Sequence, residues 1–297
     1  MKPFLKWAGG KTQLLPVILE YLPKNIENIK TYVEPFVGAG AVFIYFLEND
    51  NFDKYIINDI NSRLINLYKV IRDDVELLIN SLSELRETYA GLSIENDDRK
   101  EMYYEIRDKF NSNDIGKIEL AAYFIFLNKT CFNGLYRENS KGGFNVPIGS
   151  YEKTPDMFDA NLLRELSVKL NEKNKFGEDK VIILNKSYSE LESYIDKNTF
   201  VYFDPPYRPV TKGGFTAYDK SGFNDESQKE LAIFFERMAC KGAKVMLSNS
   251  DPKNLDINDE FFDVLYNNFT IKRVSALRSI NSNGKRRGAI NEILVYN

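Results

Sequence analysis

Short apolar runs alternate along the chain with stretches in which apolar residues recur every three or four positions. The runs are expected to form strands, at residues 31–34, 54–58, 181–184, 199–203, 243–247, 269–273 and 293–296. The periodic stretches 13–21, 41–47 and 225–240 are expected to form helices. Every residue of the run Thr199–Phe203 is β-branched or aromatic, which is typical of a strand buried on both faces. The alternation predicts an α/β protein.

From residue 62 onward the alternation of strands and helices stops. Helical patterns follow one another at residues 63–72, 75–89, 100–110 and 117–129. A segment rich in glycine and aromatic residues comes next, at 131–151, and it is too long for an ordinary connection. We interpret residues 62–177 as an insertion into a domain formed by residues 1–61 and 178–297.

Composition excludes several kinds of chemistry. The 297-residue chain has no histidine and only two cysteines, so histidine-based nucleophilic dyads, histidine-bearing zinc sites and disulfide scaffolds are excluded, and no metal is expected. No apolar stretch approaches the roughly 20 residues of a membrane helix, and the N-terminus lacks the apolar core of a signal peptide, so we expect a cytoplasmic protein. The net charge of −3 argues only mildly against a nucleic-acid partner, because binding depends on where charges lie.

The turn Asp204-Pro205-Pro206-Tyr207 follows the buried strand at its carboxyl end, where open α/β sheets bind ligands. Asp204 and the carbonyl oxygen of Pro205 can accept the two hydrogens of an aromatic amine, while Tyr207 stacks on the ring. Accepting these hydrogens makes the amine nitrogen a better nucleophile. The alternative for this motif alone is a strand that ends in a proline turn with Asp204 as a cap.

Two glycine-containing turns predict a cofactor pocket. Residues 9–11 (Gly-Gly-Lys) precede a helix and suit an anion, although the spacing of a P-loop is missing. Residues 38–40 (Gly-Ala-Gly) link a strand that ends in Glu34 to a helix, and Asp59 follows where an acidic residue accepts ribose hydroxyls. Phe43 replaces a third glycine, which disfavours a dinucleotide. Because Glu34 suits an ammonium group, the pieces together fit S-adenosylmethionine; the alternative is a structural turn with Asp59 as a helix cap.

Residues 131–151 and a group of C-terminal cations predict contact with double-stranded DNA. An aromatic residue beside Asn133 can fill the gap left by an extruded base, and Arg137 can contact O6 and N7 of guanine. The alternative is a hairpin that packs its own aromatic side chains. The cations occur without an intervening acidic residue and suit a phosphate backbone, although a solvated hairpin would also tolerate them; they are Lys272, Arg273, Arg278, Lys285, Arg286 and Arg287.

Several motifs, taken in order, resemble the Dam family of DNA adenine-N6 methyltransferases, of the D12 class and alpha group. They lie at residues 6–11, 34–40, 58–61, 132–137, 145–149 and 204–207, and residues 278–284 extend the likeness. The resemblance implies a Rossmann-like AdoMet-dependent methyltransferase sheet with an inserted, mainly helical target-recognition domain. It also implies transfer of a methyl group from S-adenosylmethionine to adenine N6 in double-stranded DNA, at GATC, with base flipping.

The resemblance further implies a role for individual residues. The catalytic residues are Asp204, Pro205, Pro206 and Tyr207. The cofactor-binding residues are Trp7, Ala8, Gly9, Gly10, Lys11, Glu34, Pro35, Phe36, Gly38, Ala39, Gly40, Asp59, Ile60, Ser187, Tyr188 and Asp204. The DNA-binding residues are Lys6, Phe132, Asn133, Leu135, Arg137, Asn139, Pro147, Arg278, Asn281 and Arg286. Two departures from the family pattern are Phe132, which replaces an intercalating tyrosine, and residues 186–188, which fit loosely.

Other functions stay open at this point. The chain could methylate an amine of RNA or of a protein, methylate adenine in another DNA sequence, or bind DNA without catalysis. The long segment 131–151 disfavours the first, and the intact turn at residues 204–207 disfavours the last. We expect a monomer, with a cognate restriction endonuclease as a candidate functional partner.

Overall fold

The structure is a computed structural model of residues 1–297, and it describes all of them except residues 8, 94–96, 113, 152, 209–222 and 278–288. The chain forms two compact units. We call them the helical unit (residues 1–10, 38–48 and 61–185) and the sheet unit (residues 11–37, 49–60 and 186–297). The boundaries predicted for an inserted domain at residues 62–177 stay a prediction.

A seven-stranded, mostly parallel sheet confirms the expected α/β class. Its strands are β1 (Thr31–Glu34), β2 (Lys54–Asn58), β3 (Val181–Leu184), β4 (Thr199–Phe203), β5 (Lys244–Ser250), β6 (Thr270–Leu277) and β7 (Ala289–Tyr296), in the order β3-β2-β1-β4-β5-β7-β6. β1 pairs in parallel with β2 and β4, and β4 pairs in parallel with β5. β7 is antiparallel to both β5 and β6. Parallel strands end at the same edge, so Glu34 and Asp204 leave the sheet on one side.

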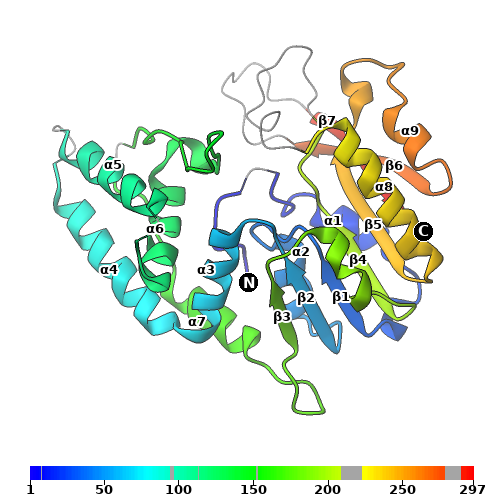
Figure 1. The fold of residues 1–297 in the computed structure, drawn as a ribbon, viewed down its shortest axis with the longest axis horizontal. Coiled ribbons are helices and arrows are strands. Elements are labelled where there is room, and N and C mark those ends of the chain that lie inside the picture. Colours follow the sequence, from blue (N-terminus) through cyan, green and yellow to red (C-terminus); the bar gives the residue numbers. More distant parts are fainter. Residues whose placement is uncertain (8, 94–96, 113, 152, 209–222, 278–288) are drawn as a thin grey trace. The chain divides into compact units, whose positions relative to one another are not determined.

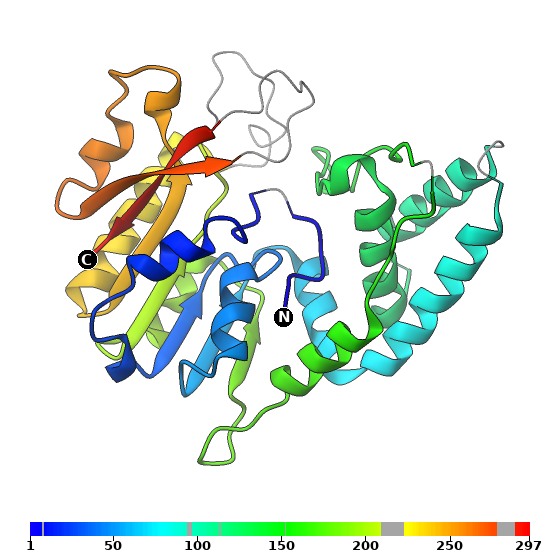
Figure 2. The same ribbon diagram turned by 180° about the vertical axis from the view of Figure 1, so that it is seen from behind.

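Residues of the sheet unit are buried as the sequence predicts. All five residues of β4 are buried, and β4 lies between β1 and β5. The rings of Tyr32, Phe52 and Phe200 form an aromatic core, with 5.5 Å between the centroids of Tyr32 and Phe52. Helices α1 (Leu15–Glu20) and α8 (Asp225–Cys240) lie on opposite faces of the sheet, as Figures 1 and 2 show from the two sides. The shorter elements are η1 (Ile26–Asn28), η3 (Tyr188–Tyr194), η4 (Pro252–Asn254) and α9 (Phe261–Leu265).

The helical unit surrounds helix α6 (Lys117–Thr130). Because α6 is apolar on nearly every side, it is buried, and α3 (Ser62–Asp73), α4 (Val75–Gly91) and α5 (Asp98–Asn111) contact it. These four helices confirm the four predicted ones. Asn61 caps α3 by accepting hydrogen bonds from the backbone of Arg63 and Leu64. Helix α2 (Ala41–Glu48) and the short turn η2 (Phe132–Gly134) also belong to this unit.

Helix α7 (Ala160–Leu170) was not predicted. Its sequence carries a signal, since Asp159 caps its first turn and buried leucines recur at Leu162, Leu166 and Leu170. In the part of the chain that the structure describes, no helix has the length and apolar character needed to cross a membrane.

Candidate active site

Asp204 follows the last residue of β4, and its carboxylate oxygen Oδ1 has two partners. Lys11 Nζ lies 2.8 Å from Oδ1, and the hydroxyl group of Ser248, on β5, donates to the same oxygen at 3.0 Å. The hydroxyl of Ser248 also contacts that of Tyr202 at 2.8 Å. The Asp204 side chain is 21% exposed and that of Lys11 is 5% exposed, so solvent reaches the carboxylate but hardly reaches the lysine. Sequence reasoning placed Lys11 with the cofactor and missed Ser248.

The protonation of Asp204 reflects opposing effects. Burial raises the pKa of its carboxyl group above the ordinary value, and the nearby charge of Glu292 acts in the same direction. The positive charge of Lys11 and the hydrogen bonds from Lys11 and Ser248 oppose this change. Lys11 therefore helps to keep a largely buried carboxylate ionised.

Tyr207 is fixed at its hydroxyl end. The hydroxyl donates to Glu292 Oε2, on β7, at 2.7 Å, and Lys11 Nζ lies 4.5 Å from the ring centroid. Burial, together with the nearby charges of Asp204 and Glu292, raises the pKa of Tyr207, so the phenol stays neutral. Sequence reasoning missed Glu292; the available signal was an acidic residue within β7, directly before the apolar run 293–295.

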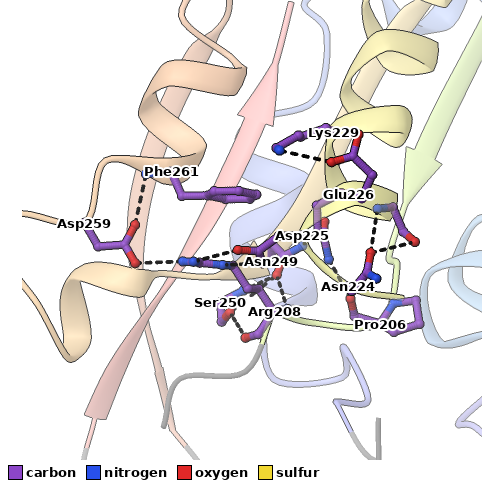
Figure 3. Close-up of polar contacts among 12 residues, drawn as sticks. Pro206, Arg208, Asn224, Asp225, Glu226, Lys229, Asn249, Ser250, Asp259 and Phe261 are labelled. Carbon is purple, nitrogen blue, oxygen red and sulfur yellow. Dashed lines mark hydrogen bonds and ion pairs between the residues drawn. The ribbon is translucent and has the colours of Figure 1, made fainter. Parts of the chain in front are cut away.

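The backbone after the turn is held by Arg208. Its guanidinium group bonds to both carboxylate oxygens of Asp225, at 2.8 and 3.0 Å, and to Asp259 at 2.7 Å. The ring of Phe261 covers the guanidinium group at 4.2 Å (Figure 3). Such a fully engaged arginine anchors the chain directly after Tyr207.

Glu34 and Asn58 lie at the ends of neighbouring parallel strands. Glu34 is 2% exposed and accepts a hydrogen bond from the hydroxyl of Tyr32 at 2.5 Å. The amide group of Asn58 donates to the carbonyl oxygens of Pro35 and Lys186, each at 3.0 Å. Asn58, which sequence reasoning did not single out as a site residue, thus connects its own segment to two others that were predicted to bind the cofactor, at residues 34–40 and 186–188.

The remaining predicted cofactor residues of the sheet unit lie at the edge formed by these strand ends. Asp59 and Ile60 follow β2 directly, and the side chain of Ile60 is 72% exposed. The rings of Phe36 and Tyr188 are neighbours, with centroids 5.5 Å apart. Ser187 caps the η3 turn that begins at Tyr188.

Trp7 and the glycines 38 and 40 form a tight cluster in the helical unit. Gly38 has a φ of +50°, and a Cβ atom there would lie 2.9 Å from Trp7 Nε1. Gly40 has a φ of +71°, and a Cβ there would lie 2.5 Å from the hydroxyl of Tyr68, which donates to the carbonyl oxygen of Gly38. Glycine is therefore required at both positions, both for its backbone and for space. Ala39 between them is buried.

The turn that carries Trp7 is also compact. The amide N–H of Gly10 donates to the carbonyl oxygen of Trp7 at 3.1 Å, and Gly9 has a φ of +76°. The Trp7 ring stacks on Tyr136, with centroids 5.6 Å apart. Ala8 lies outside the described residues.

The structure brings together Lys6 and the turn at Phe132 and Asn133. Asn128 accepts a hydrogen bond from the Lys6 N–H at 2.9 Å, and its amide donates to the carbonyl oxygens of Lys6 and Gly134. Asn133 adopts a φ of +56°, and Phe132 is 45% exposed although it is a large apolar residue. The backbone N–H of Phe132 donates to the carbonyl oxygen of Pro147. The turn therefore presents an aromatic side chain to solvent on a rigid base.

Arg137 is held by one neighbour. Its Nε donates to Asn145 Oδ1 at 2.6 Å, and one terminal nitrogen approaches the carbonyl oxygen of Asn145 at 3.4 Å. Asn139 has a role in the same loop, since its Oδ1 accepts the backbone N–H groups of Lys141 and Gly143. Leu135 adjoins the η2 turn.

The C-terminal cations are only partly described. Arg273 is paired with Asp251 at 3.1 Å and with Asp263 at 2.7 Å, so the prediction that it contacts a phosphate backbone is not supported by its surroundings. Arg278, Asn281 and Arg286 lie outside the described residues. Among the residues that the structure does describe, no cluster of His, Cys, Asp or Glu is suited to hold a metal ion.

These features define a class of protein. A mostly parallel seven-stranded sheet, with an acidic residue at the end of β1 and an Asp-Pro-Pro-Tyr turn at the end of β4, is consistent with a Rossmann-like methyltransferase. The model of one family, D12 class N6 adenine-specific DNA methyltransferase, matches residues 7–280, and the chain belongs to that family.

Curated relatives agree with this assignment. The chain is 50% identical over 303 residues to the type II methyltransferase M.MjaIII of Methanocaldococcus jannaschii. This match covers 100% of this chain and 99% of the relative. It is 36% identical to the type II methyltransferase M1.LlaDCHI of Lactococcus lactis subsp. cremoris, over 100% of this chain and 95% of the relative. It is 34% identical to the DNA adenine methylase of Escherichia coli (strain K12), over 99% of this chain and 94% of the relative. The protein is an adenine-specific DNA methyltransferase, a class whose methyl donor is S-adenosylmethionine.

Proposed function

We propose that this enzyme methylates N6 of an adenine that is extruded from double-stranded DNA, and that its target sequence is GATC. The observation that carries the proposal is the arrangement around Asp204. Among the described contacts, Lys11 and Ser248 both bind Oδ1, which leaves Oδ2 to accept a hydrogen of the adenine amino group. The carbonyl oxygen of Pro205 accepts the second hydrogen.

Tyr207 supplies the stacking surface for the extruded base. Because Lys11 Nζ lies over the ring, 4.5 Å from its centroid, the base stacks on the opposite face. Asp204 holds the amino group so that the nitrogen lone pair points away from the two accepted hydrogens. As transfer is completed, the Asp204 carboxylate, whose pKa is raised by burial, takes up the proton that N6 loses.

The residues present fit S-adenosylmethionine as the donor. The bound donor supplies an activated methyl group, so the protein needs to align and desolvate the reacting atoms rather than to activate them. Glu34 is a buried carboxylate suited to the ammonium group, and Asp59 to the ribose hydroxyls. The full proposed set is Trp7, Ala8, Gly9, Gly10, Lys11, Glu34, Pro35, Phe36, Gly38, Ala39, Gly40, Asp59, Ile60, Ser187, Tyr188 and Asp204.

We assign the recognition of DNA to residues 62–177, and within them chiefly to the loop at 131–151. Phe132, exposed on its rigid turn, fills the space vacated by the flipped adenine, with Asn133 beside it. Arg137 contacts guanine through its terminal nitrogens, because Asn145 occupies its Nε. The other proposed DNA contacts are Lys6, Leu135, Asn139, Pro147, Arg278, Asn281 and Arg286. GATC follows from the resemblance to family members that read this sequence.

A restriction endonuclease of the same specificity is the proposed functional partner, and a monomer suffices for each event because one base is flipped at a time. The relative that is 50% identical carries the name of a type II methyltransferase, which supports this proposal.

The decisive experiment replaces Asp204 by alanine. We expect loss of methyl transfer to duplex DNA by at least about 100-fold, since both alignment and the proton acceptor are removed, with DNA affinity within about threefold of wild type. Transfer of labelled methyl groups gives the rate and a filter or anisotropy titration gives the affinity. Wild-type turnover in Asp204→Ala would refute the role of Asp204.

The target sequence is tested separately in cells that express the enzyme. Their DNA is digested with one nuclease that methylation of GATC blocks and with another that requires it. We expect resistance to the first and cleavage by the second. Methylated adenine outside GATC, found by sequencing the same DNA, would show that the recognition sequence is a different one.

A further inference from the structure

Two fully buried amide side chains contact the backbone on either side of Tyr207. Gln228, on α8, donates from Nε2 to the carbonyl oxygen of Pro206 at 2.9 Å. Asn249, on β5, accepts the backbone N–H of Arg208 at Oδ1, at 3.1 Å. The two amides are joined, because Asn249 Nδ2 donates to Gln228 Oε1 at 3.2 Å. A closed ring of hydrogen bonds therefore spans the one residue between Pro206 and Arg208.

Ser250 adds two further hydrogen bonds to this network. The Ser250 hydroxyl donates to the carbonyl oxygen of Arg208 at 2.7 Å, and the Ser250 N–H also donates to Asn249 Oδ1 at 2.8 Å. Figure 3 shows Arg208 between Asp225 and Asp259, with Asn249 and Ser250 beside its backbone. Each of the two peptides next to Tyr207 is held by one of these bonds, and rotation of either peptide would break its bond to the joined amide pair.

We propose that Gln228 and Asn249 are positioning residues that set the plane of the Tyr207 ring. The inference rests on the proposed function, in which that ring stacks on the extruded adenine. Glu292 fixes the far end of the ring through the hydroxyl group, and the amide pair fixes the near end through the backbone. With both ends held, the ring is preorganised, and no ordering is required when the base arrives.

Buried amides of this kind act as a unit. Because Gln228 and Asn249 are fully buried, removal of one side chain leaves polar atoms of its partners unsatisfied, so the backbone shifts to find other partners. Gln228→Met keeps the length of the side chain and removes both hydrogen bonds. Gln228→Asn keeps an amide group but is one methylene shorter, and it cannot reach both Pro206 and Asn249. Lys229→Met is the matched control, since Lys229 is the next residue of α8, is exposed and pairs with Glu226.

The test measures kcat, DNA affinity and the emission of 2-aminopurine placed at the target adenine. This base brightens when it leaves the duplex stack and is quenched when it stacks on an aromatic ring. We expect Gln228→Met and Gln228→Asn to lower kcat at least tenfold, with affinities for DNA and S-adenosylmethionine within threefold of wild type. We also expect the emission of both variants to move toward that of Tyr207→Ala. In the Tyr207→Ala background, Gln228→Met should leave the emission unchanged.

The possible results separate the two claims. If Tyr207→Ala has wild-type kcat and emission, the stacking role itself is wrong. If Tyr207→Ala is impaired but both Gln228 variants keep wild-type kcat, only the positioning role is wrong. Equal changes in emission from Gln228→Met in both backgrounds would also overturn it, because the amide would then act independently of the ring. Should Gln228→Met fail to fold, the milder Gln228→Asn variant gives the same comparison.

Discussion

Replacement of Lys11 by methionine should move the pH dependence of methyl transfer. Methionine preserves much of the volume of the lysine side chain and removes its charge. In the wild type, that charge lies 2.8 Å from Asp204 Oδ1 and opposes the effect of burial on the carboxyl pKa. Without it, burial and the charge of Glu292 act with less opposition, so the pKa of Asp204 rises further above its ordinary value.

The size and sign of the effect follow from the pair. A neighbouring opposite charge lowers a carboxyl pKa by roughly 1–3 pH units. Asp204 keeps 21% of its side-chain surface exposed, and Ser248 still donates to it. We therefore expect the acidic limb of the pH profile to move by about 1–2 pH units. Asp204 can take up the proton that N6 loses only when it is ionised, so activity is present above its pKa and is lost as the pH falls through it. The acidic limb of the profile should therefore lie at higher pH in Lys11→Met.

The assay is the pH profile of kcat, measured with saturating duplex DNA and S-adenosylmethionine. Lys11→Arg, which keeps the charge, should have an acidic limb close to that of the wild type. Lys24→Met, at an exposed position, is the matched control for loss of a lysine. An unchanged acidic limb in an active Lys11→Met enzyme would show that Lys11 does not support the ionisation of Asp204.

Three further predictions concern other parts of the molecule. Arg137→Ala should cost roughly 1–3 kcal/mol at one guanine position only, measured as kcat/KM on DNA with single substitutions; an equal loss on all sequences would identify a phosphate contact. Phe132→Ala should reduce the 2-aminopurine signal of base extrusion but change Tm by less than about 2 °C, because the side chain is 45% exposed. Gly38→Ala should displace Trp7, since the new Cβ would lie 2.9 Å from its ring nitrogen and the φ is +50°. Trp7 is the only tryptophan of the chain, so its fluorescence reports the displacement directly, and an unchanged emission spectrum and Tm would contradict the steric argument.

Much of the fold could be predicted because its signals are local. The buried strand at Thr199–Phe203 and the four helices between residues 62 and 130 follow from apolar periodicity. Helix α7, which was not predicted, has the same kind of signal, with a cap at Asp159 and leucines at regular spacing. The position of β7 between β5 and β6 could not be predicted, since sequence order does not determine whether the last strand joins an edge of the sheet or inserts between two strands.

The candidate site divides in the same way. The acid, prolines and tyrosine at 204–207 and the glycines at 38 and 40 are adjacent in sequence, and their chemistry could be read directly. The sequence by itself therefore determined the α/β class and the composition of the turn that carries the chemistry, because both depend on neighbouring residues. Only the tertiary structure decided which side chains contact that turn and shift the pKa values of its acid and its tyrosine. Lys11 reaches Asp204, and Glu292 reaches Tyr207 across 85 positions, while Arg273, which sequence reasoning counted among the phosphate-binding cations, pairs with buried Asp251. Such contacts depend on which strands become neighbours in the sheet, and that is a property of the packed chain as a whole.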